Sequence, residues 1–369
     1  MPNFQQFAKE HHGELLRLTQ ELAVIPAPSH HEEKRAEYCL SWLQKNVSKD
    51  AFTDDAKNVI CVIGDPDVKP AVLFMAHTDI VFGEDTPLQV TERDGKLLCP
   101  GIGDDTAHVA MILLCAKYAA ENPPKDTRFI FCANSCEEGQ GNLKGCRALM
   151  ERYCKELTQM ITFDGYRELL NVKAVGSSRY RIAVDTEGGH SLWNFGNTNA
   201  IAVMSELISA LQGIPLPKED ITTFNFGNIS GGTTVNSIAQ HCELLYEFRS
   251  DNAENLDYMK EKFNGIIEKF QKKYSITVTS IGERPCAKSV DPAAQQALIE
   301  RVESVLREIT TPKHTSGSTD ANLPLSMGIP AVCPGFIQGD KLHTTEEYVV
   351  KDSLAPGLAA ALKLIDSYL

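Results

Sequence analysis

The sequence predicts an α/β fold in which a layered α/β domain is interrupted by an inserted α+β domain. Up to about residue 172, short and almost continuously apolar runs alternate with helical patterns, which is typical of strands buried on both faces of a sheet. Between residues 174 and 284 the predicted order of elements is instead β-α-β-β-α-β. The first pattern resumes after residue 285. We therefore expect a discontinuous domain, residues 1–173 with 285–369, and an inserted domain, residues 174–284.

The elements of the discontinuous domain follow from local patterns. A helix is expected at 4–24, where Pro26 and Pro28 end it, and a second at 32–45, where apolar residues recur at helical spacing. Apolar runs predict strands at 58–63, 71–75, 128–133 and 160–163. Helices are expected at 106–120 and 145–153, and after the insertion at 292–309 and 353–369, with an apolar segment at 329–333.

The inserted domain has a different pattern. Strands are expected at 177–185, 222–229, 240–248 and 275–281, and helices at 199–211 and 253–274. Two helices, each following a strand in this order, make up a ferredoxin-like α+β domain.

Composition limits the classes of function. The chain has 369 residues and a formal net charge of −13, which argues against a nucleic-acid surface. No stretch approaches the roughly 20 apolar residues of a membrane span, and the first residues lack the pattern of a secretory signal. The 11 cysteines are scattered through apolar runs, as expected of buried thiols in a reducing compartment. We therefore expect a cytoplasmic protein that binds neither membranes nor nucleic acid.

Acidic and histidine residues follow the predicted strands. They are His77 with Asp79, Asp104, the pair Glu137 and Glu138, Asp164, and His343 near the C-terminus. Because ligands bind beyond the carboxyl ends of strands in open α/β sheets, we expect these side chains to converge. Taken alone, each of these residues could have a structural role instead. Asp104, for example, precedes a helix and could cap it.

Together these residues indicate a metal site. Two histidines and three carboxylates can hold two divalent ions if one carboxylate bridges them, and nitrogen and oxygen ligands without thiolate suit Zn, Mn or Co. A carboxylate next to a metal-binding histidine fixes the tautomer of its ring, and Asp79 is placed to do so for His77. A further glutamate that is not a ligand can act as a general base.

With these residues, the sequence resembles family twenty of the metallopeptidases. This family includes peptidase T, dipeptidases, aminoacylases, acetylornithine deacetylase and glutamate carboxypeptidase. Seven motifs carry the resemblance in one order along the chain: Ala76-His77-Thr78-Asp79, Gly103-Asp104-Asp105, Glu137-Glu138-Gly139, Asp164-Gly165, Gly188-Gly189-His190-Ser191, Ser318-Thr319-Asp320-Ala321-Asn322 and His343-Thr344. The resemblance implies a zinc-exopeptidase-like α/β/α catalytic domain, with the inserted domain acting as a lid and a dimerisation domain.

The resemblance also implies roles for the residues at the strand ends. His77 and Asp164 would hold one metal, Glu138 and His343 would hold the other, and Asp104 would bridge them, with a cis peptide bond to Asp105. Asp79 would orient His77. Glu137 would take a proton from the attacking water and deliver it to the leaving nitrogen.

Further residues are implied to contact substrate. By the family pattern, His190 would stabilise the oxyanion, often in the active site of the partner subunit, and Arg249 would bind a substrate carboxylate. Asn236 and the polar loop of Ser318, Thr319 and Asp320 would make further substrate contacts. The ordinary alternatives are a loop histidine for His190, an ion pair for Arg249 and turn chemistry for the polar loop. His108 is expected to be a core histidine.

The resemblance implies an enzyme with two divalent ions per subunit, zinc by expectation, with cobalt or manganese as alternatives. An aspartate at position 164 is similar to the aminopeptidase, dipeptidase and aminoacylase branch, and the stretch 319–332 looks most like peptidase T. We therefore expect an aminopeptidase or a di- or tripeptidase that forms a homodimer through the inserted domain. The alternatives are an amidohydrolase of N-acyl amino acids with the same chemistry and, more remotely, a silent dimeric binding protein.

Overall fold

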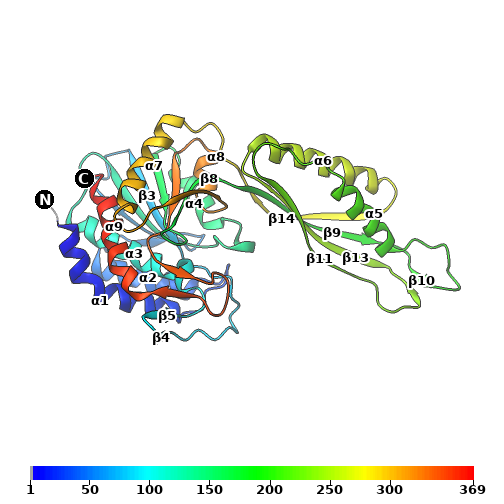
Figure 1. The fold of residues 1–369 in the computed structure, drawn as a ribbon, viewed down its shortest axis with the longest axis horizontal. Helices are drawn as coiled ribbons and strands as arrows, with labels where there is room; N and C mark the ends of the chain where they lie inside the picture. The colour runs from blue at the N-terminus through cyan, green and yellow to red at the C-terminus, as the bar shows by residue number, and fades with distance from the viewer. Residues whose placement is uncertain (1–2) are drawn as a thin grey trace. The chain divides into compact units, whose positions relative to one another are not determined.

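The computed structural model describes residues 3–369, apart from the side chain of Gln140. The chain forms two compact units. The larger unit, which we call the catalytic unit, contains the residues up to Ala174 together with Lys288–Leu369, and the smaller, which we call the inserted unit, contains Val175–Ala287 (Figure 1). The chain crosses between them near Ala174 and Lys288, where the sequence pattern changes.

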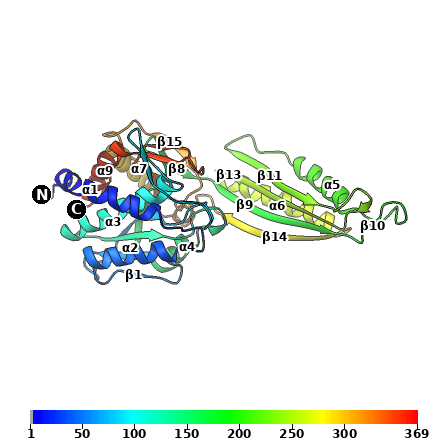
Figure 2. The same cartoon turned by 90° about the horizontal axis from the view of Figure 1, so that it is seen from below.

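The catalytic unit is built on an eight-stranded sheet of order β1-β2-β6-β3-β7-β16-β8-β15. In chain order its strands are β1 (Phe52–Thr53), β2 (Val59–Ile63), β3 (Ala71–His77), β6 (Arg128–Asn134), β7 (Leu157–Thr162), β8 (Leu169–Ala174), β15 (Lys313–Gly317) and β16 (Ala331–Pro334). Its helices are α1 (Phe4–Ala23), α2 (Glu33–Asn46), α3 (Ala107–Glu121), α4 (Lys144–Tyr153), α7 (Pro292–Leu306), α8 (Asn322–Ser326) and α9 (Leu354–Asp366). Helices flank the sheet in Figures 1 and 2.

The centre of this sheet is parallel. Strand β3 runs parallel to β6 and β7, and β7 runs parallel to β16. Every residue of β3 is buried, as predicted from its unbroken apolar run. Because His77 pairs with Asn134, the last residues of β3 and β6 lie at the same edge of the sheet. The residues that follow these strands therefore start from neighbouring points.

Sequence patterns missed several outer strands. Strands β8 and β15, and a separate sheet of order β17-β18-β5-β4, were not predicted. The strands of that sheet are β4 (Thr91–Arg93), β5 (Lys96–Leu98), β17 (Gly339–Asp340) and β18 (Tyr348–Val350). The strands of that sheet have only two or three residues, and β15 consists entirely of polar residues and glycine. Neither case produces a hydrophobic pattern from which a strand can be predicted. Strand β2 is antiparallel to β6, and β16 is antiparallel to β8, so the sheet is mixed.

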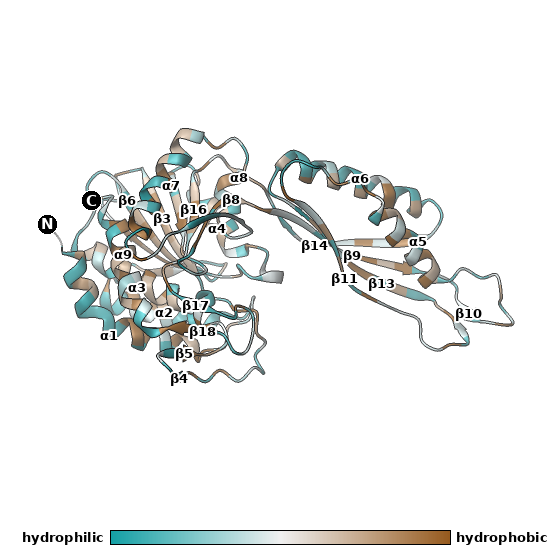
Figure 3. Ribbon diagram, in the orientation of Figure 1, coloured by the Kyte–Doolittle hydropathy of each residue, from teal (hydrophilic) through white to brown (hydrophobic). Residues whose placement is uncertain are grey.

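The inserted unit has the predicted ferredoxin-like architecture. Its sheet has the order β11-β13-β9-β14, and every neighbouring pair is antiparallel. The elements are β9 (Gly176–Asp185), α5 (Ala200–Gln212), β11 (Thr222–Gly231), β13 (His241–Ser250), α6 (Ala253–Gln271) and β14 (Ser275–Arg284). Two short strands, β10 (Gly189–His190) and β12 (Ser237–Ile238), pair with each other. Helix α6 buries an apolar stripe and exposes polar residues (Figure 3).

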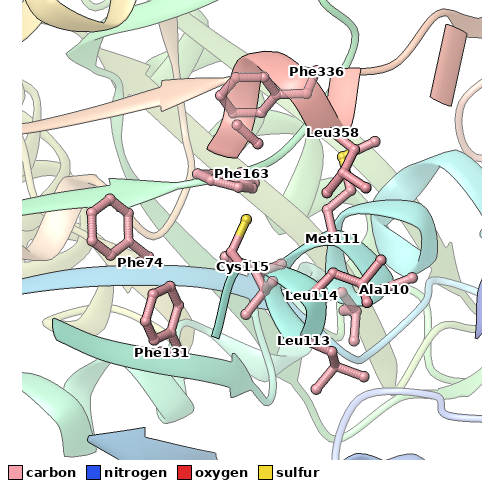
Figure 4. Close-up of a cluster of buried hydrophobic side chains, with 14 of the residues drawn as sticks. Phe74, Ala110, Met111, Leu113, Leu114, Cys115, Phe131, Phe163, Phe336 and Leu358 are labelled. Atoms are coloured by element: carbon pink, nitrogen blue, oxygen red, sulfur yellow. The ribbon is translucent and has the colours of Figure 1, made fainter. Parts of the chain in front are cut away.

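The core of the catalytic unit surrounds α3, which is buried on almost every side, as its apolar composition predicted. Phe74 and Phe131 stack with their ring centres 5.4 Å apart, and Phe163, Phe336 and Leu358 line the same cluster (Figure 4).

All 11 cysteines are free thiols, and ten of them are buried, as expected. Within residues 3–369, no helix combines the length and the apolar character needed to cross a membrane.

Candidate metal centre

Two strand ends and two loops bring the predicted ligands together. Strand β3 delivers His77 as its last residue, and Asp164 lies two residues beyond β7. Glu137 and Glu138 follow β6 after a turn in which Cys136 has a φ of +57°. Asp104 belongs to η1 (Ile102–Thr106), a π-type turn directly before α3, in which the backbone of Asp104 and Asp105 is not helical.

The side-chain atoms of these residues are within bonding range of one another. Nε2 of His77 lies 2.9 Å from one carboxylate oxygen of Asp104, and Nε2 of His343 lies 3.0 Å from the other. Nε2 of His343 is also 3.1 Å from Oε1 of Glu138. The peptide bond between Asp104 and Asp105 is cis, as the family resemblance implied.

Three overlapping groups of residues each bring their potential ligand atoms within 4.8 Å of one another. The groups are His77, Asp104 and Asp164; Asp104, Glu138 and His343; and His77, Glu137 and Glu138. Each of the five predicted ligands belongs to at least one group. The first two groups share Asp104, so one carboxylate stands between two sites. Imidazole nitrogen and carboxylate oxygen in this arrangement fit zinc and similar divalent ions.

The electrostatics of the site also favour cations. Burial raises the pKa of Glu138 to about 7, and burial together with the Asp104 carboxylate raises the pKa of Asp164. Hydrogen bonds to Asp104 and Glu138 raise the pKa of His343 to about 10. Several negative groups thus lie close together at this site, an arrangement that a divalent cation would stabilise.

Asp79 holds the turn that carries both glutamates. Its Oδ1 accepts the backbone N–H of Glu137 at 2.9 Å, and its Oδ2 accepts the backbone N–H of Glu138 at 3.0 Å and the hydroxyl of Ser29 at 2.6 Å. Nδ1 of His77 lies 3.0 Å from the backbone oxygen of Asp79 and 3.5 Å from its carboxylate. Burial alone would raise the pKa of Asp79, but His77 and Ser29 hold it below its usual value.

His108 lies behind the site and is completely buried. Its Nε2 accepts the backbone N–H of Phe336 at 3.0 Å, so its Nδ1 carries the proton and donates it to Asp105 at 2.6 Å. Burial lowers the pKa of His108 to about 3, which agrees with a neutral ring. His108 is therefore a satisfied core histidine, as predicted. The other oxygen of Asp105 accepts the N–H of His77.

The predicted substrate loop lies in the catalytic unit. Ser318 is half-buried, Thr319 is buried, and Asp320 is completely buried and accepts a hydrogen bond from Nδ2 of Asn134 at 2.6 Å. Because Asn134 pairs with His77, this loop adjoins the strand ends that carry the ligands.

The inserted unit holds the other three predicted residues. His190 is exposed, and its Nδ1 accepts the backbone N–H of Leu192 at 3.2 Å. Asn236 is close to it, because the backbone oxygen of Asn236 accepts the N–H of Ser191 at 3.0 Å. Arg249 lies near the far end of β13 and makes a two-point pair with Glu247, with N–O distances of 2.9 and 3.1 Å.

Sequence reasoning missed three buried charged residues near the centre. Glu32 accepts hydrogen bonds from the N–H of His30 and from the N–H and thiol of Cys136. Arg35 donates to two backbone oxygens and to the hydroxyl of Thr106, and burial lowers its pKa to about 10. The third is Glu347, described below. A charged residue on the apolar face of a helix was the available signal for Arg35.

Comparison with known proteins agrees with this geometry. The sequence pattern of peptidase family M20/M25/M40 matches residues 73–367. A succinyl-diaminopimelate desuccinylase from Psychrobacter arcticus is 27% identical over 312 residues, covering 77% of this chain and 75% of that protein. Two solved structures share the fold. Aminopeptidase PepT from Bacillus cereus has a TM-score of 0.76 and 21% identity, and the match covers 97% of this chain and 98% of that one. A tripeptidase from Staphylococcus aureus has a TM-score of 0.77 and 20% identity, with the same coverage of the two chains.

The fold and the family match thus define a metallohydrolase. The chain belongs to peptidase family M20/M25/M40. The family and the fold class predicted from the sequence are confirmed. The predicted class of enzyme, a metallohydrolase, is confirmed as well.

Proposed function

We propose that this protein is a dinuclear metal-dependent exopeptidase that removes residues from the N-terminus of short peptides. The observation that carries the proposal is the pair of ligand groups that share Asp104. His77 and Asp164 would complete one site, and Glu138 and His343 the other, with zinc as the expected ion and cobalt or manganese as alternatives. Divalent ions bound there would supply Lewis acidity to the scissile carbonyl and to the attacking water.

Glu137 is the proposed general base and acid. Its backbone is fixed by Asp79, while its own carboxylate lies in the ligand group with His77 and Glu138. A Glu137 oxygen would accept the proton as the water oxygen attacks the carbonyl carbon, and it would return that proton to the nitrogen as the C–N bond breaks. Replacing Glu137 by Gln is expected to abolish turnover and to preserve metal binding. Retained turnover would assign the base elsewhere.

The proposed substrate contacts support a homodimer. Arg249 lies eight residues from His241 on β13, about 27 Å at the usual rise per residue, and the His190 and Asn236 loops join the His241 end. An extended tripeptide spans only about 10 Å. If His190 and Arg249 contact one short substrate, they therefore come from two chains.

Mixing two inactive variants tests this arrangement. We would refold an equal mixture of H190A and E137Q chains. If His190 serves the partner's active site, half of the dimers are hybrids with one complete site each, so about a quarter of the wild-type activity returns. A mixture as inactive as the separate variants would show that His190 acts within its own chain. An H190A variant that is active by itself would show that His190 is not needed.

An amidohydrolase of N-acyl amino acids is the second candidate, and the similarity to a desuccinylase favours it. The chemistry is the same, and the difference is whether the pocket accepts a free amine or an acyl chain. We would assay di- and tripeptides, N-terminally blocked peptides and N-acyl amino acids with added Zn, Mn or Co. Hydrolysis of free peptides alone is expected, whereas hydrolysis of N-acyl amino acids alone would favour the second candidate.

Metal analysis tests the shared basis of both candidates. About two divalent ions per chain are expected by the two-metal logic. A reconstituted protein that binds no divalent ion would leave the third candidate, a silent binding protein. The free thiols also support a cytoplasmic location for the enzyme.

A further inference from the structure

Glu347 is a completely buried carboxylate whose hydrogen bonds all go to one loop of the metal centre. Its Oε2 accepts the backbone N–H of Gly101 at 2.7 Å. Its Oε1 accepts the backbone N–H groups of Gly103 and Asp104, both at 2.8 Å. Burial and the nearby Asp104 carboxylate raise the pKa of Glu347 to about 7, while these three N–H groups oppose that shift by stabilising its ionised form.

The loop is shaped to receive this carboxylate. Gly101 has a φ of +73°, a left-handed conformation that lets nearby N–H groups point into one concavity. Gly103 leaves the necessary space, since a Cβ built there would lie 2.9 Å from Oε1 of Glu347. The backbone of residues 101–104 thus forms an anion-binding nest, and Glu347 fills it from within the protein.

We propose that Glu347 is the positioning residue that sets Asp104 between the two metal sites. The bond from the Asp104 N–H fixes the backbone from which its carboxylate reaches both His77 and His343. Glu347 follows His343 by four residues, and its backbone oxygen accepts the N–H of Cys99 at 3.1 Å. One residue therefore ties the segment that carries His343 to the loop that carries Asp104.

This role rests on the proposed function, because it concerns the ligands of that metal centre. The positioning role of Glu347 and a purely structural role predict different effects on metal binding when Glu347 is replaced. If Glu347 only stabilised the fold, its loss would lower the melting temperature while the folded protein bound metal normally. If it sets Asp104, its loss weakens both metal sites in protein that remains folded, since the two sites share that carboxylate.

The substitution Glu347→Gln separates these roles. The amide keeps one oxygen, but its NH₂ group must face either Gly101 or the pair Gly103 and Asp104, so one set of N–H donors loses its acceptor. The matched control is Glu346→Gln. Glu346 is the adjacent glutamate, its side chain is 71% exposed, and it pairs with Lys341 at 2.5 Å on the surface.

We would titrate Zn²⁺ into the metal-free wild-type, E347Q and E346Q proteins by calorimetry and record the melting temperature of each metal-free protein. Loss of a residue that orients a ligand typically weakens metal affinity by about 10–100-fold, and this is expected for E347Q alone. If E347Q fails to fold, Glu347→Asp keeps the charge but withdraws the oxygens by one methylene, and it is expected to weaken Zn²⁺ binding by about 10-fold.

The outcomes are distinct. Weaker Zn²⁺ binding by folded E347Q or E347D, with E346Q unchanged, supports the positioning role. Wild-type affinity in E347Q, or in E347D if E347Q does not fold, overturns it and leaves the proposed function standing. If the wild-type protein itself binds no divalent ion, the proposed function and this role fail together.

Discussion

Replacing Asp79 by Asn is the most informative single change to the metal centre. The carboxylate of Asp79 uses one oxygen for the N–H of Glu137 and the other for the N–H of Glu138 and for Ser29. Asparagine has the same shape but only one acceptor oxygen. Whichever way the amide turns, its NH₂ group faces one of the two backbone N–H groups. The substitution therefore disturbs the turn that carries both glutamates without creating a cavity.

The size of the effect follows from the bonds that are lost. A hydrogen bond to a charged group contributes about 1.5–3 kcal/mol, and a buried N–H left without an acceptor costs a similar amount. If the hydrogen bonds that hold Glu137 and Glu138 in place weaken by about 1.5–3 kcal/mol, kcat or the metal affinity is expected to decrease by about 10–150-fold. The same loss should appear in the free energy of unfolding.

The assay is steady-state hydrolysis of a peptide substrate at saturating metal, with urea unfolding of the metal-free protein in parallel. Asp85→Asn is a suitable control, because Asp85 is an exposed acidic residue on the loop after β3. We expect D85N to match the wild-type protein. If D79N keeps wild-type kcat, metal affinity and stability within about twofold, Asp79 does not hold the glutamate turn, and the reasoning is wrong.

Three further predictions concern the same unit. Chelation should abolish activity, and readdition of metal should restore it and raise the free energy of unfolding by about 2.7 kcal/mol for each site saturated 100-fold above its Kd. Gly101→Ala should destabilise the protein by about 1–3 kcal/mol in urea unfolding, because φ is +73° and the new Cβ would lie 2.4 Å from Cγ2 of Ile80. Glu32→Ala should cost about 1.5–3 kcal/mol in urea unfolding, because the buried N–H of Cys136 and the N–H of His30 would lose the oxygen that accepts them. The neighbouring Glu33 is exposed, and Glu33→Ala should cost under about 1 kcal/mol. Equal effects would contradict this account.

Much of the fold could be predicted because burial leaves a direct mark on the sequence. The runs that form β3 and β6 are apolar at nearly every position, and the predicted strands needed only one or two residues more at their ends. The polar strand β15 and the short strands of the second sheet had no such mark. Strand β15 pairs with β8, and β18 pairs with β5, which are distant in the chain, so local patterns could not find these pairings.

The candidate ligands could also be predicted, because metal chemistry restricts them to a few residue types. His77, Asp104, Glu138, Asp164 and His343 were placed at strand ends or by motif, and the structure brings their side chains within one cluster. Apart from Asp79, the residues that hold the backbone around this cluster were not found. Glu32 and Glu347 accept backbone N–H groups, and every residue except proline has an N–H, so their partners carry no signature.

The sequence by itself determined the alternation of elements, the inserted unit, the buried strands and the residue types that can hold divalent ions. Only the tertiary structure showed which carboxylates gather in the candidate ligand groups and which accept hydrogen bonds from the backbone. Glu347 and Gly101 are 246 residues apart and meet at 2.7 Å. An ionised carboxylate is stable in a buried position only when donors or cations surround it, and that environment exists only once the chain has folded.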